Sequence, residues 1–228
     1  LCVLGTRAWA TSSAGPAILH TWDAGDTWSL ATGTVVTRGW ALKQPLLAGS
    51  QRGSSFGLNP VYRSTIDAAI GSRFYVSRDD GDTWTQFSTL PGTGTKVNAM
   101  LVSPKDSLRI VCTTSAPQKV IWSQDGGATW NTSLTRAFGE YGIPLAIDPD
   151  HPDTVFFAGD SSALYRSTDF GQTWAPWGAK VFRSPCVLVV VPGADSGVVI
   201  VGDGTTGTGY GDLWRSNDHG ATFTKQFT

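Results

Sequence analysis

The sequence is poor in charge and in long apolar runs. Charged residues make up 15% of the 228 residues, below the roughly 25% that is usual for soluble domains. Lys+Arg 17 against Asp+Glu 18 gives a formal net charge of −1, which argues against binding of nucleic acid through a basic surface. The longest apolar run, 186–191, is far shorter than the ~20 residues that a membrane helix needs. We therefore expect no nucleic-acid partner and no membrane span.

Cysteine and histidine are also scarce, and neither is clustered. The three cysteines form no dense disulfide framework; we expect buried free thiols at Cys112 and Cys186, which lie in apolar runs, and leave the state of Cys2 open. The three histidines have no metal-ligand spacing. Three aspartates within 148–153 could bind Ca²⁺, but this segment is more typical of a turn between strands. We therefore expect no metal ion and no cofactor.

Aromatic residues and turn formers, in contrast, are plentiful. The chain has Trp 10, Phe 10 and Gly 27, with 40% hydrophobic residues, a composition typical of a globular, β-rich protein with a packed core. Five segments repeat the pattern Ser/Thr-x-Asp-x-Gly-x-Thr-Trp/Phe, and all five match at every fixed position: 21–28, 77–84, 123–130, 167–174 and 216–223. We call these five segments the corners.

Each corner is predicted to be the turn of a β-hairpin, because strand-like residues precede and follow it. The aspartate can accept hydrogen bonds from turn amides, and the glycine supplies a positive φ at no steric cost. The terminal Trp or Phe can bury its ring between neighbouring sheets. The corner aspartates are therefore interpreted as structural rather than ligand-binding: Asp23, Asp79, Asp125, Asp169 and Asp218.

The corner aspartates are 56, 46, 44 and 49 residues apart. A period of about 40–50 residues with four short strands in each unit is typical of propeller blades. The sequence predicts an all-β chain that forms one domain over 1–228, a β-propeller of about five four-stranded blades. In the fourth unit the predicted strands are 144–148, 154–158, 163–166 and 173–175; in the third they are 98–102, 109–112, 120–122 and 129–131.

Three further predictions concern the irregular parts of the repeat. Residues 1–4 align with a second strand, so the first blade is expected to lack its inner strand and to leave an exposed sheet edge. The polar segment 49–57 is expected to be a surface loop. The apolar run 186–191 is expected to be an inner strand that is covered on both faces.

The corners resemble the Asp-box, or bacterial neuraminidase repeat, of sialidases, xyloglucanases, sortilin-type receptors and photosystem II assembly factors. The sequence patterns of three segments, 74–84, 145–149 and 212–223, are most similar to those of the xyloglucanase group of glycoside hydrolases. The segment 182–185 is similar to a sialidase Arg motif, but it is a single short match late in the chain. Members of the xyloglucanase group carry two larger propellers with a catalytic Asp from each, whereas this chain is long enough for one small ring.

The resemblance implies a secreted, extracellular carbohydrate-active propeller that binds or hydrolyses a polysaccharide or acidic glycan. Two alternatives remain open. The chain can be a protein-interaction propeller of the sorting-receptor or assembly-factor type, with a protein partner or the rest of a longer chain, or it can be a lectin without catalysis. Whether it is an enzyme stays undecided at this point.

Ligands of such propellers usually meet the loops opposite the corners, as the resemblance implies. The segments that lead into four inner strands each carry one basic residue: Arg38, Lys96, Arg136 and Arg183. If all four point inward, they form a cationic mouth that would attract an anionic ligand. Alternatively, each pairs with a neighbouring aspartate or extends into solvent.

Glu140 is the only glutamate of the chain and precedes the fourth inner strand. A glycosidase needs two carboxyl groups, and Glu140 with Asp148 or Asp67 is the pairing that we predict, with Tyr141 beside it. Glu140 can equally form a salt bridge with Arg136. Three loop aromatics could stack on sugar rings or instead pack between blades: Trp40, Trp177 and Tyr210.

Overall fold

The computed structural model describes residues 2–4, 7–11, 18–30, 32–33, 54–58, 66–70, 72–78, 83–92, 95–139, 143–191, 193, 197–204 and 211–226. Within these residues the regular elements are β-strands, which confirms the predicted all-β class. No helix in this part of the chain is long and apolar enough to cross a membrane.

The strands form five sheets, numbered here in chain order. The first contains β1 (Cys2–Leu4), β2 (Arg7–Thr11), β3 (Ile18–Thr21) and β4 (Ser29–Leu30). The second contains β6 (Ser54–Leu58), β7 (Ile66–Ile70), β8 (Arg73–Ser77) and β9 (Thr83–Thr89), with β5 (Thr32–Gly33) added in parallel to β9. The third contains β10 (Lys96–Val102), β11 (Ile110–Ser115), β12 (Lys119–Ser123) and β13 (Asn131–Leu134).

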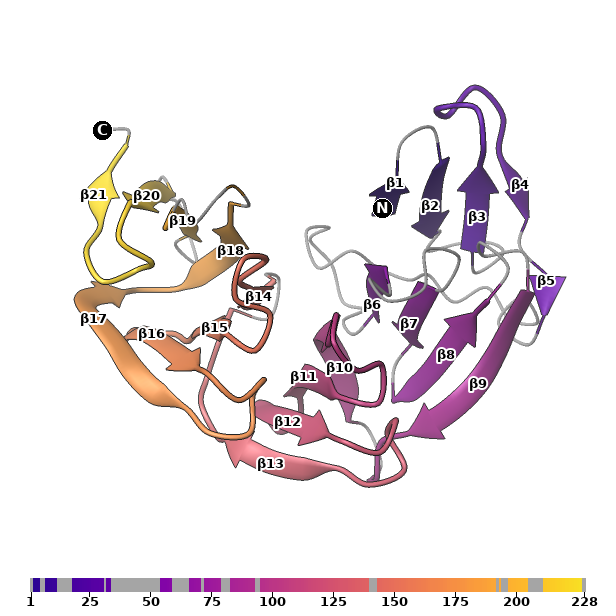
Figure 1. The fold of residues 1–228 in the computed structure, drawn as a ribbon, viewed down its shortest axis with the longest axis horizontal. Helices are drawn as coiled ribbons and strands as arrows, with labels where there is room; N and C mark the ends of the chain where they lie inside the picture. Colours follow the sequence, from indigo (N-terminus) through magenta and orange to yellow (C-terminus); the bar gives the residue numbers. More distant parts are fainter. Residues whose placement is uncertain are drawn as a thin grey trace.

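The fourth sheet contains β14 (Leu145–Ile147), β15 (Val155–Ala158), β16 (Ser162–Ser167) and β17 (Ala175–Phe182). The fifth contains β18 (Pro185–Val190), β19 (Val199–Asp203), β20 (Asp212–Ser216) and β21 (Thr224–Lys225). Apart from β5, consecutive strands pair antiparallel in chain order. Figure 1 shows the five sheets along an arc, with the first strand of each four-strand set innermost and an opening between the first and fifth sheets.

The hydrophobic core lies in layers between neighbouring sheets. Because side chains of a strand alternate between its faces, Met100 of β10 packs with Phe74 of the second sheet, whereas Ala99 faces Phe157 of the fourth. A third layer joins the fourth and fifth sheets through Phe156, Leu164, Phe182, Leu188, Val199 and Val201. The third and fourth sheets are thus covered on both faces.

The two cysteines that the structure describes in full are free. Cys112 of β11 is fully buried, and burial raises the pKa of its thiol well above the ordinary value. Cys186 of β18 is half-buried, and its Sγ donates to the carbonyl oxygen of Gly202 at 3.3 Å. The expected buried free thiol therefore holds fully for Cys112 and in part for Cys186.

The first sheet corrects the prediction that its inner strand is missing. Residues 2–4 form the innermost strand β1, and Arg7–Thr11 forms the second strand, with Leu4 paired to Arg7. Arg7–Thr11 carries one large apolar residue, Trp9, between two alanines, so no repeated large apolar residues mark it as a strand. The first sheet has four strands.

The predicted surface loop 49–57 is also wrong at its end, because Ser54–Leu58 is the strand β6. Its five residues Ser-Ser-Phe-Gly-Leu pair along their whole length with β7, from Ser54 opposite Ile70 to Leu58 opposite Ile66. Backbone pairing with an adjacent strand overrides the low strand propensity of serine and glycine. Residues 49–53 lie outside the described part.

The inner, second and third strands of the third and fourth sheets lie within a few residues of their predicted positions. The outer strands begin later than predicted: β13 begins at Asn131 and β17 at Ala175. Their predicted first residues belong to the corners, which hold the backbone in a turn. The expectation that 186–191 is covered on both faces is wrong, because the fifth sheet ends the arc and Val189 is 43% exposed.

Candidate functional site

The described corners share one set of hydrogen bonds. In the fourth corner, Ser167 Oγ donates to Asp169 Oδ1 at 2.7 Å and accepts from the amide of Gly171 at 2.7 Å. Asp169 Oδ1 accepts from the amide of Thr173 at 2.9 Å, and its Oδ2 accepts from Thr173 Oγ1 at 2.6 Å. The same four bonds, between 2.5 and 3.1 Å, recur in the first, third and fifth corners. Asp79 of the second corner lies outside the described residues.

These donors favour the ionised form of each corner aspartate. Hydrogen bonds from Thr129 and Ser123 lower the pKa of Asp125 to about 2, and those from Ser216 and Thr222 lower the pKa of Asp218 to about 2. The pKa of Asp23 is lowered further, through Thr21 and Thr27. A carboxylate that is ionised near neutral pH and already accepts several hydrogen bonds is suited to holding a turn, not to donating a proton.

The rings that end the third, fourth and fifth corners pack on the preceding sheet. Trp130 stacks on Phe74 of β8, with centroids 4.8 Å apart and planes at 19°. Trp174 Nε1 donates to Ser133 Oγ of β13 at 2.9 Å, and Phe223 meets Phe182 of β17 edge-on at 5.1 Å. Trp28 belongs to the first sheet of the arc and is 40% exposed.

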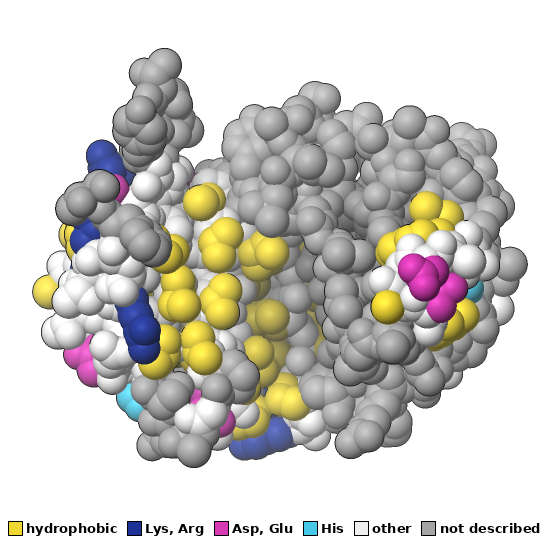
Figure 2. Space-filling model, turned by 90° about the horizontal axis from the view of Figure 1, so that it is seen from above, with side chains coloured by type: hydrophobic (Ala, Val, Ile, Leu, Met, Phe, Trp, Pro, Cys, Tyr) yellow, Lys and Arg dark blue, Asp and Glu magenta, His cyan; other side chains and the backbone are white. Residues whose placement is uncertain are grey.

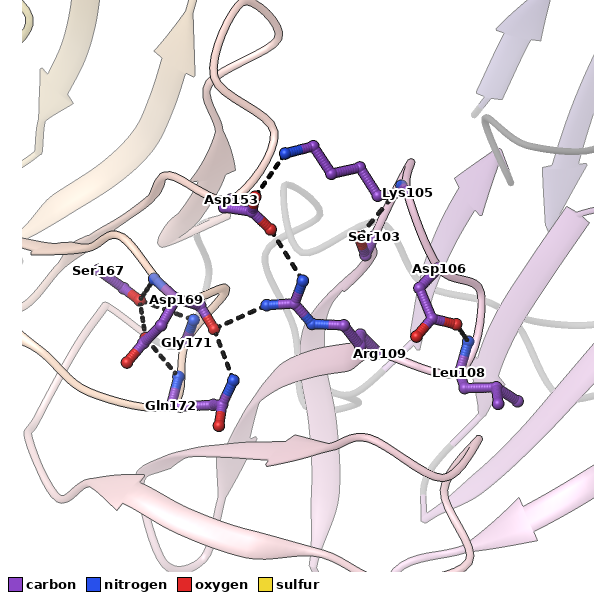
Figure 3. A network of polar contacts seen from close by, with 10 residues as sticks. All are labelled: Ser103, Lys105, Asp106, Leu108, Arg109, Asp153, Ser167, Asp169, Gly171 and Gln172. Carbon is purple, nitrogen blue, oxygen red and sulfur yellow. Dashed lines mark hydrogen bonds and ion pairs between the residues drawn. The ribbon is translucent and has the colours of Figure 1, made fainter.

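A network of charged groups joins the third and fourth sheets beside the fourth corner (Figure 3). Arg109 donates from Nη1 to Asp153 Oδ1 at 2.8 Å and from Nη2 to the carbonyl oxygen of Asp169 at 2.9 Å. Its guanidinium also lies 5.2 Å from the ring centroid of Phe170, and Lys105 Nζ lies 2.5 Å from Asp153 Oδ2. No local sequence pattern indicates this network, because Arg109 and Asp153 are 44 residues apart.

Of the predicted catalytic carboxylates, the structure describes the side chain of Asp148 only. Asp148 is 4% exposed; its Oδ1 accepts from the amides of Asp150 and His151 at 3.0 and 3.2 Å, and its Oδ2 lies 3.2 Å from His151 Nδ1. Asp148 directly follows Ile147, the last residue of β14, whereas the described segment that ends at Gly139 precedes β14 in the chain. Glu140, Tyr141 and the side chain of Asp67 lie outside the described part of the chain.

Two of the predicted basic residues contact partners in different sheets. The guanidinium of Arg136 lies 5.8 Å from the ring centroid of Tyr165 in β16. Arg183 Nη2 donates to Asp212 Oδ2 of β20 at 3.1 Å, and its backbone amide donates to the buried carboxylate of Asp203 at 3.0 Å. Lys96 begins β10 and is half-buried. Arg38 lies outside the described residues.

The loop aromatics are placed by the structure in one case. Trp177 packs between the fourth and fifth sheets, donates from Nε1 to the carbonyl oxygen of His219 at 2.8 Å, and carries the guanidinium of Arg166 over its ring at 4.4 Å. Of the two alternatives for Trp177, the structure supports packing between sheets. Trp40 and Tyr210 lie outside the described residues.

The described side chains offer no group of three or more His, Cys, Asp or Glu residues that could hold a metal ion. Within 148–153, Asp148 binds the amides of its own turn, whereas Asp153 pairs with Lys105 and Arg109. These aspartates thus have separate structural partners and do not converge on one point.

Comparison with known proteins relates the chain to two kinds of propeller. The family model described as sortilin, neurotensin receptor 3 (Sortilin-Vps10) matches residues 72–185, half of the chain. The VPS10 domain-containing receptor SorCS2 of Homo sapiens is 26% identical over 121 residues, 51% of this chain and 10% of the receptor. The xyloglucanase of Hypocrea jecorina (strain QM6a) is 28% identical over 207 residues, 88% of this chain and 24% of that protein.

A solved structure shows a similar fold. The GH74 xyloglucanase from Xanthomonas campestris superposes with a TM-score of 0.64 at 19% identity, over 96% of this chain and 36% of that chain. The likeness establishes the β-propeller fold for this arc of sheets. The chain spans a quarter or less of the length of the two sequence relatives described above.

Proposed function

Because this chain belongs to the Sortilin-Vps10 family and aligns over most of its length with a xyloglucanase, we propose that it is a carbohydrate-active propeller. In this proposal one domain over 1–228 contains five blades, each with an Asp-box turn, and it binds or hydrolyses a polysaccharide of the xyloglucan class outside the cell. The observation that carries the proposal is the alignment with the xyloglucanase over 88% of the chain.

The corners support the fold part of this proposal. In the third, fourth and fifth corners the aspartates and threonines bond within the turn and the rings pack on the preceding sheet, which leaves the opposite ends of the strands for a ligand. Lys96, Arg136 and Arg183 lie close to those ends, at or before the first residues of β10, β14 and β18. The ligand-binding part of the proposal therefore includes them, together with Arg38, Trp40, Tyr141 and Tyr210.

Hydrolysis is the more demanding form of the proposal, because it needs two carboxyl groups at a defined separation. Glu140 is the proposed acid, and Asp148 is the proposed second carboxyl group. The capping bonds of Asp148 weigh against a mobile role for it, since its two oxygens already accept hydrogen bonds from its own turn. If Glu140 is the acid, Glu140→Gln should abolish hydrolysis and preserve binding. Asp106→Asn is the control and should leave both unchanged.

The test incubates the purified chain with xyloglucan and measures new reducing ends together with binding by calorimetry. Cleavage that Glu140→Gln removes supports a glycoside hydrolase. Binding without cleavage supports a lectin. If the chain neither binds nor cleaves xyloglucan, the carbohydrate proposal is wrong.

A second candidate function is a protein-interaction propeller. It is favoured by the Sortilin-Vps10 match and by the similarity to a receptor, SorCS2. The two deeply buried carboxylates Asp148 and Asp203 also fit it, because both accept hydrogen bonds from backbone amides: Asp148 from its own turn, and Asp203 from the segment that precedes β18. Two results together would favour this function: the chain does not bind glycans, and it cross-links to a specific protein partner.

A further inference from the structure

Three basic side chains gather where the fourth and fifth sheets meet. Two of them bind one carboxylate: Lys225 Nζ lies 2.9 Å from Asp212 Oδ1, and Arg183 Nη2 donates to Asp212 Oδ2 at 3.1 Å. The third, Lys180 of β17, holds its Nζ 3.9 Å from the ring centroid of Trp214. We call Lys180, Arg183 and Lys225 the basic cluster.

Strand geometry places these groups on one face. Asp212 and Trp214 are two residues apart in β20, so their side chains point to the same face of the fifth sheet. Lys225 of β21 is paired with Trp214, which puts Lys225 on that face as well. Trp214 packs in the layer between the fourth and fifth sheets, so this face is turned toward the strand that carries Lys180 and is followed by Arg183. The basic cluster is therefore built from both sheets.

All three cations act on the same carboxylate. The hydrogen bond and the charge of Lys225, with the charges of Arg183 and Lys180, lower the pKa of the Asp212 carboxyl against the opposing effect of partial burial. A lowered pKa means that the ionised form is favoured at this place. The basic cluster thus stabilises a carboxylate, with one cation at each of its oxygens.

Positive charge exceeds negative charge around the basic cluster. Within the described residues, the cluster's three cations form ion pairs with one carboxylate, that of Asp212, and Lys180 Nζ donates to the carbonyl oxygen of Val181 at 2.8 Å. Asp203 is opposite Asp212 in β19, but it is 1% exposed and its oxygens accept from two backbone amides before β18. The surplus positive charge therefore faces water.

A ligand can reach this surplus charge. The side chains of Arg183 and Lys225 are 62% and 38% exposed, whereas Asp212 between them is 18% exposed. Arg183 uses Nη2 for Asp212, so the other N–H donors of its guanidinium can bind an incoming oxyanion. Figure 2 shows Lys and Arg side chains at the left of the view, on the side where Figure 1 places the fifth sheet.

We propose that the basic cluster binds the carboxylate groups of an acidic polysaccharide, a chain that contains uronic acid residues. Asp212 shows that these cations accommodate a carboxylate, and it competes with the ligand for them. The choice of a polysaccharide as the carrier of the carboxylate rests on the proposed carbohydrate function. The inference goes beyond that function, because it assigns a charged substrate class and extends the contact of Arg183 outward to Lys180 and Lys225.

The test measures binding of the purified chain by calorimetry to polygalacturonate, to its methyl ester and to xyloglucan. Esterification removes the charge and keeps the sugar chain, so polygalacturonate should bind at least about tenfold more tightly than the ester. Lys180→Gln and Lys225→Gln should each weaken polygalacturonate binding about threefold, as expected of a partly exposed charge pair. Asp212→Asn should strengthen it about threefold, because the competing carboxylate is gone.

Lys105→Gln is the matched control, because it removes an exposed lysine between the third and fourth sheets and should leave affinity unchanged. Equal weakening by Lys105→Gln would show unspecific attraction and overturn the inference. Polygalacturonate binding that Lys180→Gln and Lys225→Gln both leave intact would also overturn it, as would a wild-type chain that does not bind polygalacturonate. Tighter binding of polyglutamate than of polygalacturonate would assign the basic cluster to an acidic protein and overturn the polysaccharide.

The xyloglucan titration tests the proposed function separately. If xyloglucan binds and polygalacturonate does not, the proposed function stands and the inference is wrong. If polygalacturonate binds as expected and xyloglucan does not, the basic cluster is supported and the xyloglucan function is contradicted. The thermal midpoint of each variant, measured in the same buffer, shows whether a change in affinity reflects the ligand contact or a loss of folded protein.

Discussion

Trp174 donates its indole N–H to Ser133 Oγ at 2.9 Å, across the boundary between the fourth and third sheets. The same N–H also reaches the carbonyl oxygen of Gly171 within its own corner, at 3.1 Å. The residue therefore ties a turn and two neighbouring sheets together. Its ring contributes to the hydrophobic layer that contains Phe157 and Val111.

Trp174→Ala should lower the free energy of unfolding by about 2–4 kcal/mol, because it removes a half-buried ring and leaves a cavity in this layer. Trp28→Ala is the matched control: the ring ends an equivalent corner but is 40% exposed, so its loss should cost less than about 1 kcal/mol. Chemical denaturation followed by fluorescence or circular dichroism measures both values. Equal losses would contradict the inter-sheet role of the corner ring.

The ion pair between Arg109 and Asp153 gives a second prediction. Arg109 and Asp153 have side chains 23% and 35% exposed, so water screens their attraction in part. Asp153→Asn should lower the free energy of unfolding by about 1 kcal/mol in dilute buffer, and by less in 1 M salt, where charges are screened.

Lys105→Gln serves as the comparison for this pair. Lys105 contacts the same carboxylate, but its side chain is 56% exposed. The bond to the fourth corner, at the Asp169 carbonyl, comes from Arg109. Its loss should cost less than about 0.5 kcal/mol. A larger effect for Lys105→Gln than for Asp153→Asn would contradict the network drawn in Figure 3.

The corners also predict how stability depends on pH. Their hydrogen bonds lower the pKa of Asp125 and Asp218 to about 2, below the model-peptide value of 3.8. A carboxyl group with a lowered folded-state pKa stabilises the fold above its unfolded pKa, and this contribution is lost as pH falls toward the folded pKa. The thermal midpoint should therefore fall between about pH 4 and pH 2.

The matched variant for this pH dependence is Asp125→Asn. It should be less stable than the wild type at pH 7 and should lose less stability on acidification, because one of the titrating groups is absent. Asp106→Asn, which removes an exposed aspartate outside the corners, should keep the wild-type slope. Identical acid profiles for the wild type and Asp125→Asn would show that the corner carboxylates do not control acid stability.

The sequence predicted the corners and most strands of the third and fourth sheets because these depend on local patterns. Ser167, Asp169 and Thr173 bond within seven residues of one another, so their spacing alone indicates the turn. The strands β5 and β6 were missed because β5 has only two residues and β6 is rich in serine and glycine; pairing with β9 and β7 makes them strands. Long-range pairing of this kind leaves no local pattern.

The candidate site was less predictable, since the direction of a long side chain depends on distant partners. Arg136 and Arg183 were found at equivalent positions of the repeat, but one lies over Tyr165 and the other pairs with Asp212. The exposure of Trp28 was hidden for another reason. The corner motif predicts a covered ring at its last position, whereas Trp28 is 40% exposed.

Gly171 provides the last prediction, because its corner approaches the third sheet closely. Its φ is +86°, and a Cβ at this position would lie 2.6 Å from Val111 Cγ2 of β11. Gly171→Ala should therefore lower the free energy of unfolding by at least about 2 kcal/mol, from backbone strain and from overpacking against the valine.

The control is Gly193→Ala, whose φ is +142° and whose Cβ would meet nothing within 4 Å. This variant shares an unfavourable φ without the contact. In addition, Val111→Ala should cost less in the Gly171→Ala background than in the wild type, since neighbouring changes that share a contact are not additive. Equal losses for the two glycine variants would mean that φ alone, and not the approach of the two sheets, requires glycine at this corner.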